Sequence, residues 1–303
     1  MAVVFPVVLW ITTSQADTLV PAPVFNQTPE DNFTANPVLP EELRYLPLPA
    51  PVRKNIGVNF NGEKLHYTVS FLLFFHAADA NITFTKDTAV KNGYIAELEG
   101  HTSGIIKILT FQRRDRYISH MVMMDNGKRL RSAKFEKVSK QGGRKTKRSE
   151  TVFDYENKIV HWKVWKGDEL AGEGSRPIPE NTVYDDPLSA FYNFRYGVYG
   201  DIQKGKPIEV KSVPTTRESK IELLIASEEE TQKKNNVSSK KSSREYLVKV
   251  LMDKDVFDQT KGNIELWLSK DFVPVEGVVK GVVLVGDIHG VLRPDKENKP
   301  QSG

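Results

Sequence analysis

Apolar and polar residues alternate along much of this chain, and the alternation predicts β-strands. From Leu65 to Phe75 every second residue is Leu, Tyr, Val or Phe, which gives one face of a strand an apolar surface. The segment from Phe71 to Phe75 is apolar on both faces and predicts a strand that is covered on both sides. Comparable runs follow at 81–85, 94–98, 116–124, 129–138, 149–155, 158–167, 206–213, 219–226, 245–252, 264–269 and 274–292.

Turn-forming residues separate these runs. Asn92-Gly93 and Asn126-Gly127 each stand between two alternating segments, and an Asn-Gly pair in that position is typical of a β-hairpin. Many short strands joined by hairpins form an antiparallel sheet. We therefore predict a mainly β fold, with a curved antiparallel sheet or an open barrel or sandwich and one or two short helices packed on it.

Two segments have the spacing of helices. Residues 103–112 place apolar side chains on one face after a serine. In the second segment, Asp186 supplies an N-cap, Pro187 stands in the first turn and Gly197 ends the helix. Its residues at helical i, i+3, i+4 and i+7 positions are Leu188, Phe191, Tyr192 and Arg195. We expect the helix at about 186–196 to pack against the concave side of the sheet.

The remaining composition suggests one folded domain with polar or extended additions. Residues 17–58 are rich in proline, which favours an extended strap or linker. Residues 59–293 form the predicted β-rich domain. Within it, residues 228–244 are almost without apolar side chains and predict a mobile polar loop. Residues 294–303 are expected to be a disordered tail.

The N-terminal residues predict export. Residues 2–11 are an apolar run of the length found in signal peptides, and the small residues Ser14 and Ala16 precede a suitable cleavage point. The basic residues that usually precede such a run are missing. The run is too short for a bilayer, which needs about 20 apolar residues. We expect a signal peptide over residues 1–16 and a periplasmic protein of a Gram-negative bacterium that is not transmembrane.

The absence of cysteine and the modest charge exclude several classes of function. A chain without cysteine has no disulfides, no thiolate metal ligands and no cysteine nucleophile. The formal net charge of +4 is mildly basic. Proteins that bind nucleic acid usually combine clustered Lys and Arg with aromatic residues on one face, and that pattern is missing here. We therefore expect no nucleic-acid partner.

One short motif points toward catalysis. Residues 286–290 read Gly-Asp-Ile-His-Gly, similar to a turn that brings Asp and His to the two-metal centre of phosphoesterases. That chemistry needs further Asp, Asn and His ligands, and the thirteen residues that follow Gly290 contain no histidine. We therefore expect no enzymatic activity, no cofactor and no metal site. A metal-dependent phosphoesterase remains a remote alternative, and a turning strand is the simpler interpretation.

Four residues are candidates for binding a ligand. Trp162 and Trp165 lie on opposite faces of their predicted strand, and such rings can bind sugars, line an apolar cavity or serve only for packing. Arg195 lies on a helix that faces the sheet, so it needs an acidic partner, a backbone carbonyl or the anionic head group of a ligand. Tyr192 lies one turn before it. A structural salt bridge is the simpler interpretation of Arg195.

The hairpin at 134–150 is rich in lysine and arginine. Clusters of this kind are attracted to phosphate-bearing lipids and other anionic surfaces. The alternative is a solvated hairpin whose charges prevent edge-to-edge pairing with another sheet.

Three segments resemble a bacterial exported family known as domain of unknown function 3108. They are LHYTVSFLLFFHAADANITF, DDPLSAFYNFRYG and IELWLSKDFVPVEGVVKGVVLVGDIHGVL, and together the resemblance spans residues 60–292. One departure is that FHAAD replaces the glycine usual in the first turn. The resemblance implies an exported or periplasmic β-rich domain. It implies no activity, ligand or catalytic residue.

These observations lead to two hypotheses of function. The first is a non-enzymatic periplasmic or cell-envelope protein that binds a lipid-like or apolar small molecule within the curved sheet. The second is a structural or interaction module whose basic hairpin docks on a partner or on an anionic envelope polymer.

Overall fold

The computed structural model describes residues 55–71, 74–103, 112–200, 203–213, 219–236, 244–252, 262–282 and 286–293. The predicted signal peptide, nearly all of the Pro-rich strap, most of the first predicted helix and the whole predicted tail lie outside these ranges.

All strands of the described chain belong to one antiparallel sheet of 14 strands, in the order β8-β7-β6-β5-β4-β3-β2-β1-β14-β13-β12-β11-β10-β9. The strands are β1 (Lys64–Phe71), β2 (Phe74–Asp87), β3 (Gly93–Thr102), β4 (Arg114–Met124), β5 (Arg129–Lys140), β6 (Lys147–Asp154), β7 (Ile159–Lys166), β8 (Glu169–Pro177), β9 (Pro207–Ser212), β10 (Ser219–Ile225), β11 (Tyr246–Met252), β12 (Gly262–Leu268), β13 (Pro274–Val282) and β14 (Gly286–Leu292).

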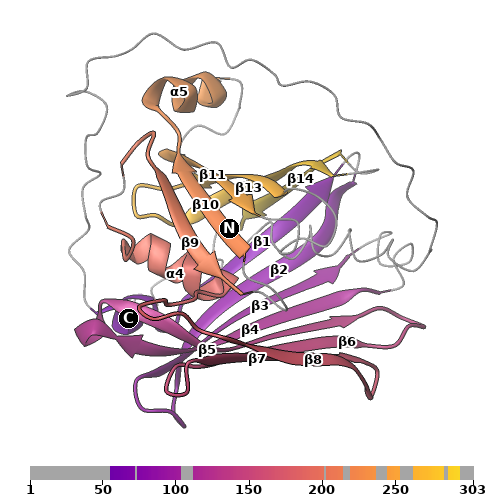
Figure 1. The fold of residues 1–303 in the computed structure, drawn as a ribbon. Coiled ribbons are helices and arrows are strands. Elements are labelled where there is room, and N and C mark those ends of the chain that lie inside the picture. Colours follow the sequence, from indigo (N-terminus) through magenta and orange to yellow (C-terminus); the bar gives the residue numbers. More distant parts are fainter. Residues whose placement is uncertain are drawn as a thin grey trace, which may run out of the picture.

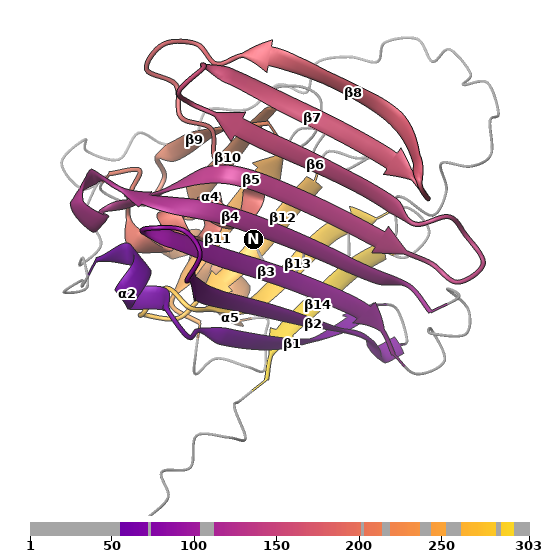
Figure 2. The same ribbon diagram turned by 90° about the horizontal axis from the view of Figure 1, so that it is seen from below.

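The sheet curls so that its two halves face each other. Strands β1 to β8 form one half and β9 to β14 the other, with β8 and β9 at the two edges (Figures 1 and 2). The halves meet where β1 pairs with β14, for example Val69 opposite Gly290. The predicted curved antiparallel sheet is confirmed, and the edges leave it open rather than closed as a barrel.

Most of the strand predictions are confirmed, and three segments differ. The apolar run at 65–75, predicted as one strand, is divided between β1 and β2, and Phe71 lies opposite Phe74. The segment FHAAD, expected at the first turn, therefore lies in β2. The run at 274–292 is divided into β13 and β14. Strand β8 was not predicted, because Gly172 and Gly174 interrupt any alternation. It forms by pairing with β7, where Trp162 lies opposite Gly174. Neighbouring strands, rather than local sequence preference, determine this edge of the sheet.

The prediction of a polar loop at 228–244 was wrong for the first half of that segment, which forms helix α5 (Glu228–Asn236). Three glutamates occupy the first turn and two lysines the last, an arrangement that complements the helix dipole. Ion pairs from Lys249 to Glu230 and from Lys234 to Glu265 connect the helix to the sheet. This segment therefore forms a helix although it contains few apolar residues.

Helix α4 (Pro187–Tyr196) lies between the two halves of the sheet (Figure 1) and packs against β3, β4 and β5. The predicted position on the concave side is confirmed. The Asp186 carboxylate accepts from the backbone N–H groups of Leu188 and Ser189, and Gly197 ends the helix in the left-handed conformation. All residues from Pro187 to Arg195 are buried, so every polar group on the helix needs a partner inside the protein.

Two neighbouring aspartates fix the start of α4 to the sheet. Asp186 accepts hydrogen bonds from the hydroxyls of Ser119 and Ser132 at 2.5 and 2.7 Å. Asp185 accepts from Arg129 at 2.6 Å and from the Tyr199 hydroxyl at 3.0 Å. Burial raises the pKa of Asp185 to about 6 and also raises the pKa of Asp186.

The other described helices are short. Helix α2 (Ile56–Phe60) is capped by the Asn55 side chain and buries Ile56 and Phe60 against the sheet, and a single 3-10 turn, η2 (Asp125–Gly127), joins β4 to β5. None of the helices in the described ranges is both long and apolar enough to cross a membrane.

The raised pKa of Asp185 predicts a specific pH dependence of stability. Between about pH 4 and pH 6 the folded protein keeps a proton that the unfolded chain has released. The contribution of this carboxyl to stability is therefore complete below pH 4 and is lost as the pH rises through 6, by about 3 kcal/mol in total. Urea unfolding of the wild type and of Asp185→Asn at several pH values measures the effect.

We expect the wild type to lose stability relative to Asp185→Asn across this interval. The exposed Asp154, whose hydrogen bonds with Asn157 lower its pKa, is the control, because Asp154→Asn should give a small difference of opposite sign. Parallel stability curves for the wild type and Asp185→Asn would contradict the interpretation.

Candidate functional site

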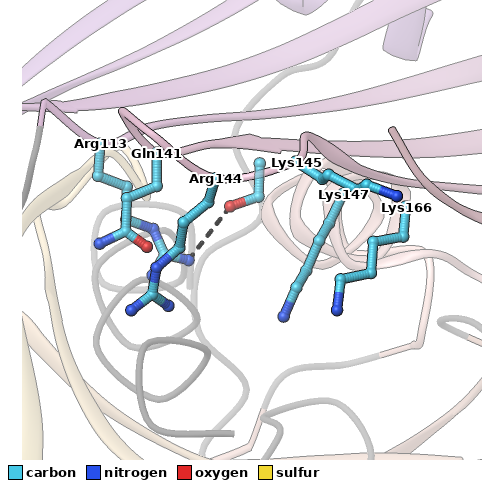
Figure 3. A pocket seen from close by; sticks show the side chains of 7 residues that line it. Arg113, Gln141, Arg144, Lys145, Lys147 and Lys166 are labelled. Carbon is cyan, nitrogen blue, oxygen red and sulfur yellow. Dashed lines mark hydrogen bonds between the residues drawn. The ribbon is translucent and has the colours of Figure 1, made fainter. Parts of the chain in front are cut away.

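A basic pocket lies at one end of the sheet, where β4 and β6 begin and β5 and β7 end. Five cationic side chains and two polar ones line it: Arg113, Arg144, Lys145, Lys147, Lys166, Ser139 and Gln141. Lys147 and Lys166 extend side by side in the same direction, with Arg113 and Arg144 across from them (Figure 3).

The strand register places the pocket on the concave face. Lys147 pairs with Ser139 on one side and with Lys166 on the other. Along β7 the alternate residues Val160, Trp162, Val164 and Lys166 share one face. Because Val160 belongs to the main hydrophobic core, Lys166 also points to the concave side.

Arg113 and Lys145 each have an acidic partner. The buried Arg113 donates to Asp115 at 2.9 Å and to the Ser139 hydroxyl at 3.3 Å. Burial raises the pKa of Asp115, and the Arg113 charge opposes that rise. Lys145 lies 3.7 Å from Glu169 in an exposed pair, which contributes little stability. Arg113 is therefore held in place at the base of the pocket.

Lys147 and Lys166 form no ion pair with any residue of the described part of the chain. They are nevertheless directly opposite each other on neighbouring strands. Like charges in this position repel, because their Cβ atoms lie about 5 Å apart. On its other side Lys166 lies opposite Glu169 of β8, the carboxylate that pairs with Lys145. The site is therefore rich in positive charge, with Glu169 at its edge.

This arrangement of side chains suits an anion. Lysine and arginine donate charge-assisted hydrogen bonds to phosphate and carboxylate oxygens. The polar groups of Ser139 and Gln141 lie beside them. In the described residues we find no group of three His, Asp or Glu side chains placed to hold a metal ion.

Arg195, a candidate from the sequence, lies in the core. Its guanidinium donates two hydrogen bonds of 2.7 Å to Glu63 and one of 2.9 Å to the carbonyl of Phe272. The rings of Phe60 and Phe191 lie 4.7 and 5.0 Å from it. Arg195 thus has the acidic partner and the backbone carbonyl that were the alternatives to a ligand head group.

Tyr192, the second candidate, is fully buried beside Arg195. Its ring packs against Phe84 and Phe60, with centroids 4.5 and 5.0 Å away. Its hydroxyl is near the Glu63 carboxylate but makes no hydrogen bond of normal geometry within the described part of the chain. Burial raises its pKa well above the usual value. The structure brings Tyr192 and Arg195 together, around Glu63.

Trp162 and Trp165 lie on opposite faces of β7, as their spacing predicts. Trp165 is on the outer face, where Arg148 stacks over it at 4.0 Å. Trp162 is half-buried on the concave face, and its ring lies over Gly174. The two tryptophans therefore cannot form one binding surface. Only Trp162 shares a face with the basic pocket.

The Gly-Asp-Ile-His-Gly motif lies in strand β14, where Asp287 forms an ion pair of 2.8 Å with Lys280. His289 is opposite Ser70 on one side and Val278 on the other. The motif is part of a paired strand, in agreement with the simpler interpretation.

The sequence indicated the basic hairpin but not the pocket. Of the hairpin's cations, Lys134 pairs with Glu136 and Glu150 on the outer face, and Arg148 stacks on Trp165. Arg113, just before β4, and Lys166, at the end of β7, join the site only through strand pairing. The alternation along β7 was the one sequence signal that could have linked Lys166 to Lys147.

Comparison with known proteins identifies a family and shows similarity to solved structures. The profile of the family described as "Protein of unknown function (DUF3108)" matches residues 66–290. A search of curated proteins finds no match. Among solved structures, a β-barrel-like protein of domain of unknown function DUF1849 from Brucella abortus aligns at 12% identity and a TM-score of 0.44, covering 76% of this chain and 94% of that one.

The contacts of Arg195 predict strong coupling with Glu63. Replacing only one member leaves a buried charge without its partner, so Glu63→Gln and Arg195→Met should each lower the free energy of unfolding by about 3 kcal/mol. The double variant should be less destabilised than the sum of both by about 2 kcal/mol. Urea unfolding measures all three.

An exposed ion pair provides the control. Lys163 and Glu173 lie 3.8 Å apart on the outer face, so Lys163→Met should change stability by less than about 1 kcal/mol. Additive effects of Glu63→Gln and Arg195→Met would show that the two side chains do not act as a pair.

Proposed function

This chain belongs to the DUF3108 family of proteins of unknown function, and we propose that it is a non-enzymatic, exported binding protein of the bacterial cell envelope. Its ligand is an anionic, phosphate-bearing molecule that occupies the basic pocket. The apolar run at residues 2–11 supports the exported location. Bacterial membranes and their attached polymers carry phosphate groups that attract clustered lysine and arginine.

One observation carries this proposal: Lys147 and Lys166 are adjacent, and neither forms an ion pair within the described chain. A protein that needed only a stable sheet would favour opposite charges or neutral residues at such a cross-strand pair. An arrangement that lowers stability is typical of a binding site, where the ligand supplies the missing charge.

The binding position differs from the one that the helix candidates suggested. Arg195 already forms an ion pair with Glu63 and is buried in the last turn of α4. A ligand at that position would have to displace a buried ion pair. At the end of the sheet, by contrast, the lysines are available to an anion without any rearrangement of the core. We therefore assign the ligand to the basic pocket.

We expect pyrophosphate, a small phosphate probe, to bind the full chain in isothermal titration at low salt. Replacing Lys147 and Lys166 together by serine removes two charge-assisted contacts and should weaken binding by at least about tenfold. The same variant should be slightly more stable than the wild type at low salt, because the repulsion between the lysines is removed.

The matched control is Lys158→Ser with Lys163→Ser, which removes the same charge from β7 and the turn before it but leaves the pocket intact. It should bind pyrophosphate as the wild type does, apart from a small effect of net charge. If both double variants weaken pyrophosphate binding equally, the loss comes from the change in net charge and not from the pocket. Absence of binding to the wild type would refute the proposed site.

A further inference from the structure

We infer that the ligand of the basic pocket is a phosphate-bearing lipid, with the phosphate among the cations and the acyl chain extended along the concave face toward Trp162. This inference rests on the proposed function and adds the chemical class of the ligand. Its evidence is the surface that continues from the pocket along strands β6, β7 and β8.

Trp162 and Lys166 are on the same face of β7, four residues apart. Since a strand rises about 3.3 Å per residue, the two side chains start about 13 Å apart. Their partners on β6 are Thr151 and Lys147. The face therefore runs from a charged end at Lys147 and Lys166 to an aromatic end at Trp162, over a distance that suits an extended alkyl chain.

The residues between these two ends are uncharged on the strands concerned. Val164 lies midway on β7, opposite Ser149 of β6 and Gly172 of β8. A side chain added at Gly172 would meet no atom within 4 Å, so the surface is open at this point. A half-buried valine beside an open glycine offers an alkyl chain an apolar contact and room to lie flat.

Gly174 fixes the aromatic end. A Cβ atom at this position would lie 2.4 Å from the Trp162 ring, so the ring lies directly on the glycine backbone. Trp162 is only half-buried, which leaves part of its ring on the concave face. A tryptophan held flat in this way presents a rigid apolar surface at little cost in side-chain entropy.

Charge and polarity favour a lipid over a sugar phosphate. On neighbouring β5, Lys137 lies opposite Ser149, and its ammonium is 5.7 Å from the centroid of the Phe135 ring. This cation therefore lies beside the middle of the surface, on the neighbouring strand. Sugar hydroxyls require several polar side chains in fixed positions, whereas Val164, Gly172 and the Trp162 ring offer mainly apolar contact.

Titration of the full chain with butyl phosphate, decyl phosphate and inorganic phosphate tests the inference, because these probes share the phosphate and differ in the alkyl part. Each fully buried methylene contributes about a fourfold gain in affinity. We therefore expect decyl phosphate, below its micelle concentration, to bind at least about tenfold more tightly than butyl phosphate.

Two variants locate the alkyl chain. Trp162→Ser and Gly172→Val should each reduce that tenfold advantage to less than about threefold, the first by removing apolar contact and the second by filling the open surface. Both should still bind pyrophosphate like the wild type. Trp165→Ser, on the outer face, is the matched control and should keep the full preference for decyl phosphate.

The possible outcomes separate this inference from the proposed function. If butyl and decyl phosphate bind with equal affinity while pyrophosphate binding still depends on Lys147 and Lys166, the ligand is not a lipid. The proposed anion site would then still stand. If glucose 1-phosphate binds more tightly than decyl phosphate, and Trp162→Ser removes that preference, the ligand is a sugar phosphate and the lipid inference is wrong. If none of the phosphate probes binds, the proposed function is wrong as well.

Discussion

The fold depends on one constraint, the complete burial of helix α4 between the two halves of the curled sheet. A buried helix must find internal partners for its charged and polar groups. The Asp186 carboxylate accepts hydrogen bonds from the first N–H groups of the helix and from the hydroxyls of Ser119 and Ser132 on the sheet. At the other end, Arg195 binds Glu63 and the carbonyl of Phe272. These contacts join α4 to both halves of the sheet.

The same constraint separates the interior from the binding surface. The charges near α4 are neutralised inside the protein, whereas Lys147 and Lys166 form no ion pair within the described chain. Hydrogen-bonded polar groups in the interior help to fix a unique core. Unpaired like charges on neighbouring strands reduce stability. One set of charges thus supports the fold, and we propose that another, at the end of β5 to β7, binds a ligand.

Sequence periodicity predicted the strands and helix α4, because burial imposes a period of two or of 3.6 residues on the chain. It did not predict β8, whose glycines pack against Trp162 from the neighbouring strand, or helix α5, whose stability comes from charges at its ends. The pocket was less predictable still. Arg113 and Lys166 are far apart in the sequence, and only the pairing of β4 to β7 brings them together.

Native mass spectrometry of the full chain, purified under mild conditions from bacterial envelope fractions, tests the lipid-binding role most directly. We expect a co-purifying phosphate-bearing lipid on the wild type and its loss from the variant in which Lys147 and Lys166 are both serine. A wild-type protein that carries no ligand, or a ligand that the double variant retains equally well, would contradict a phosphate-binding site at this end of the sheet.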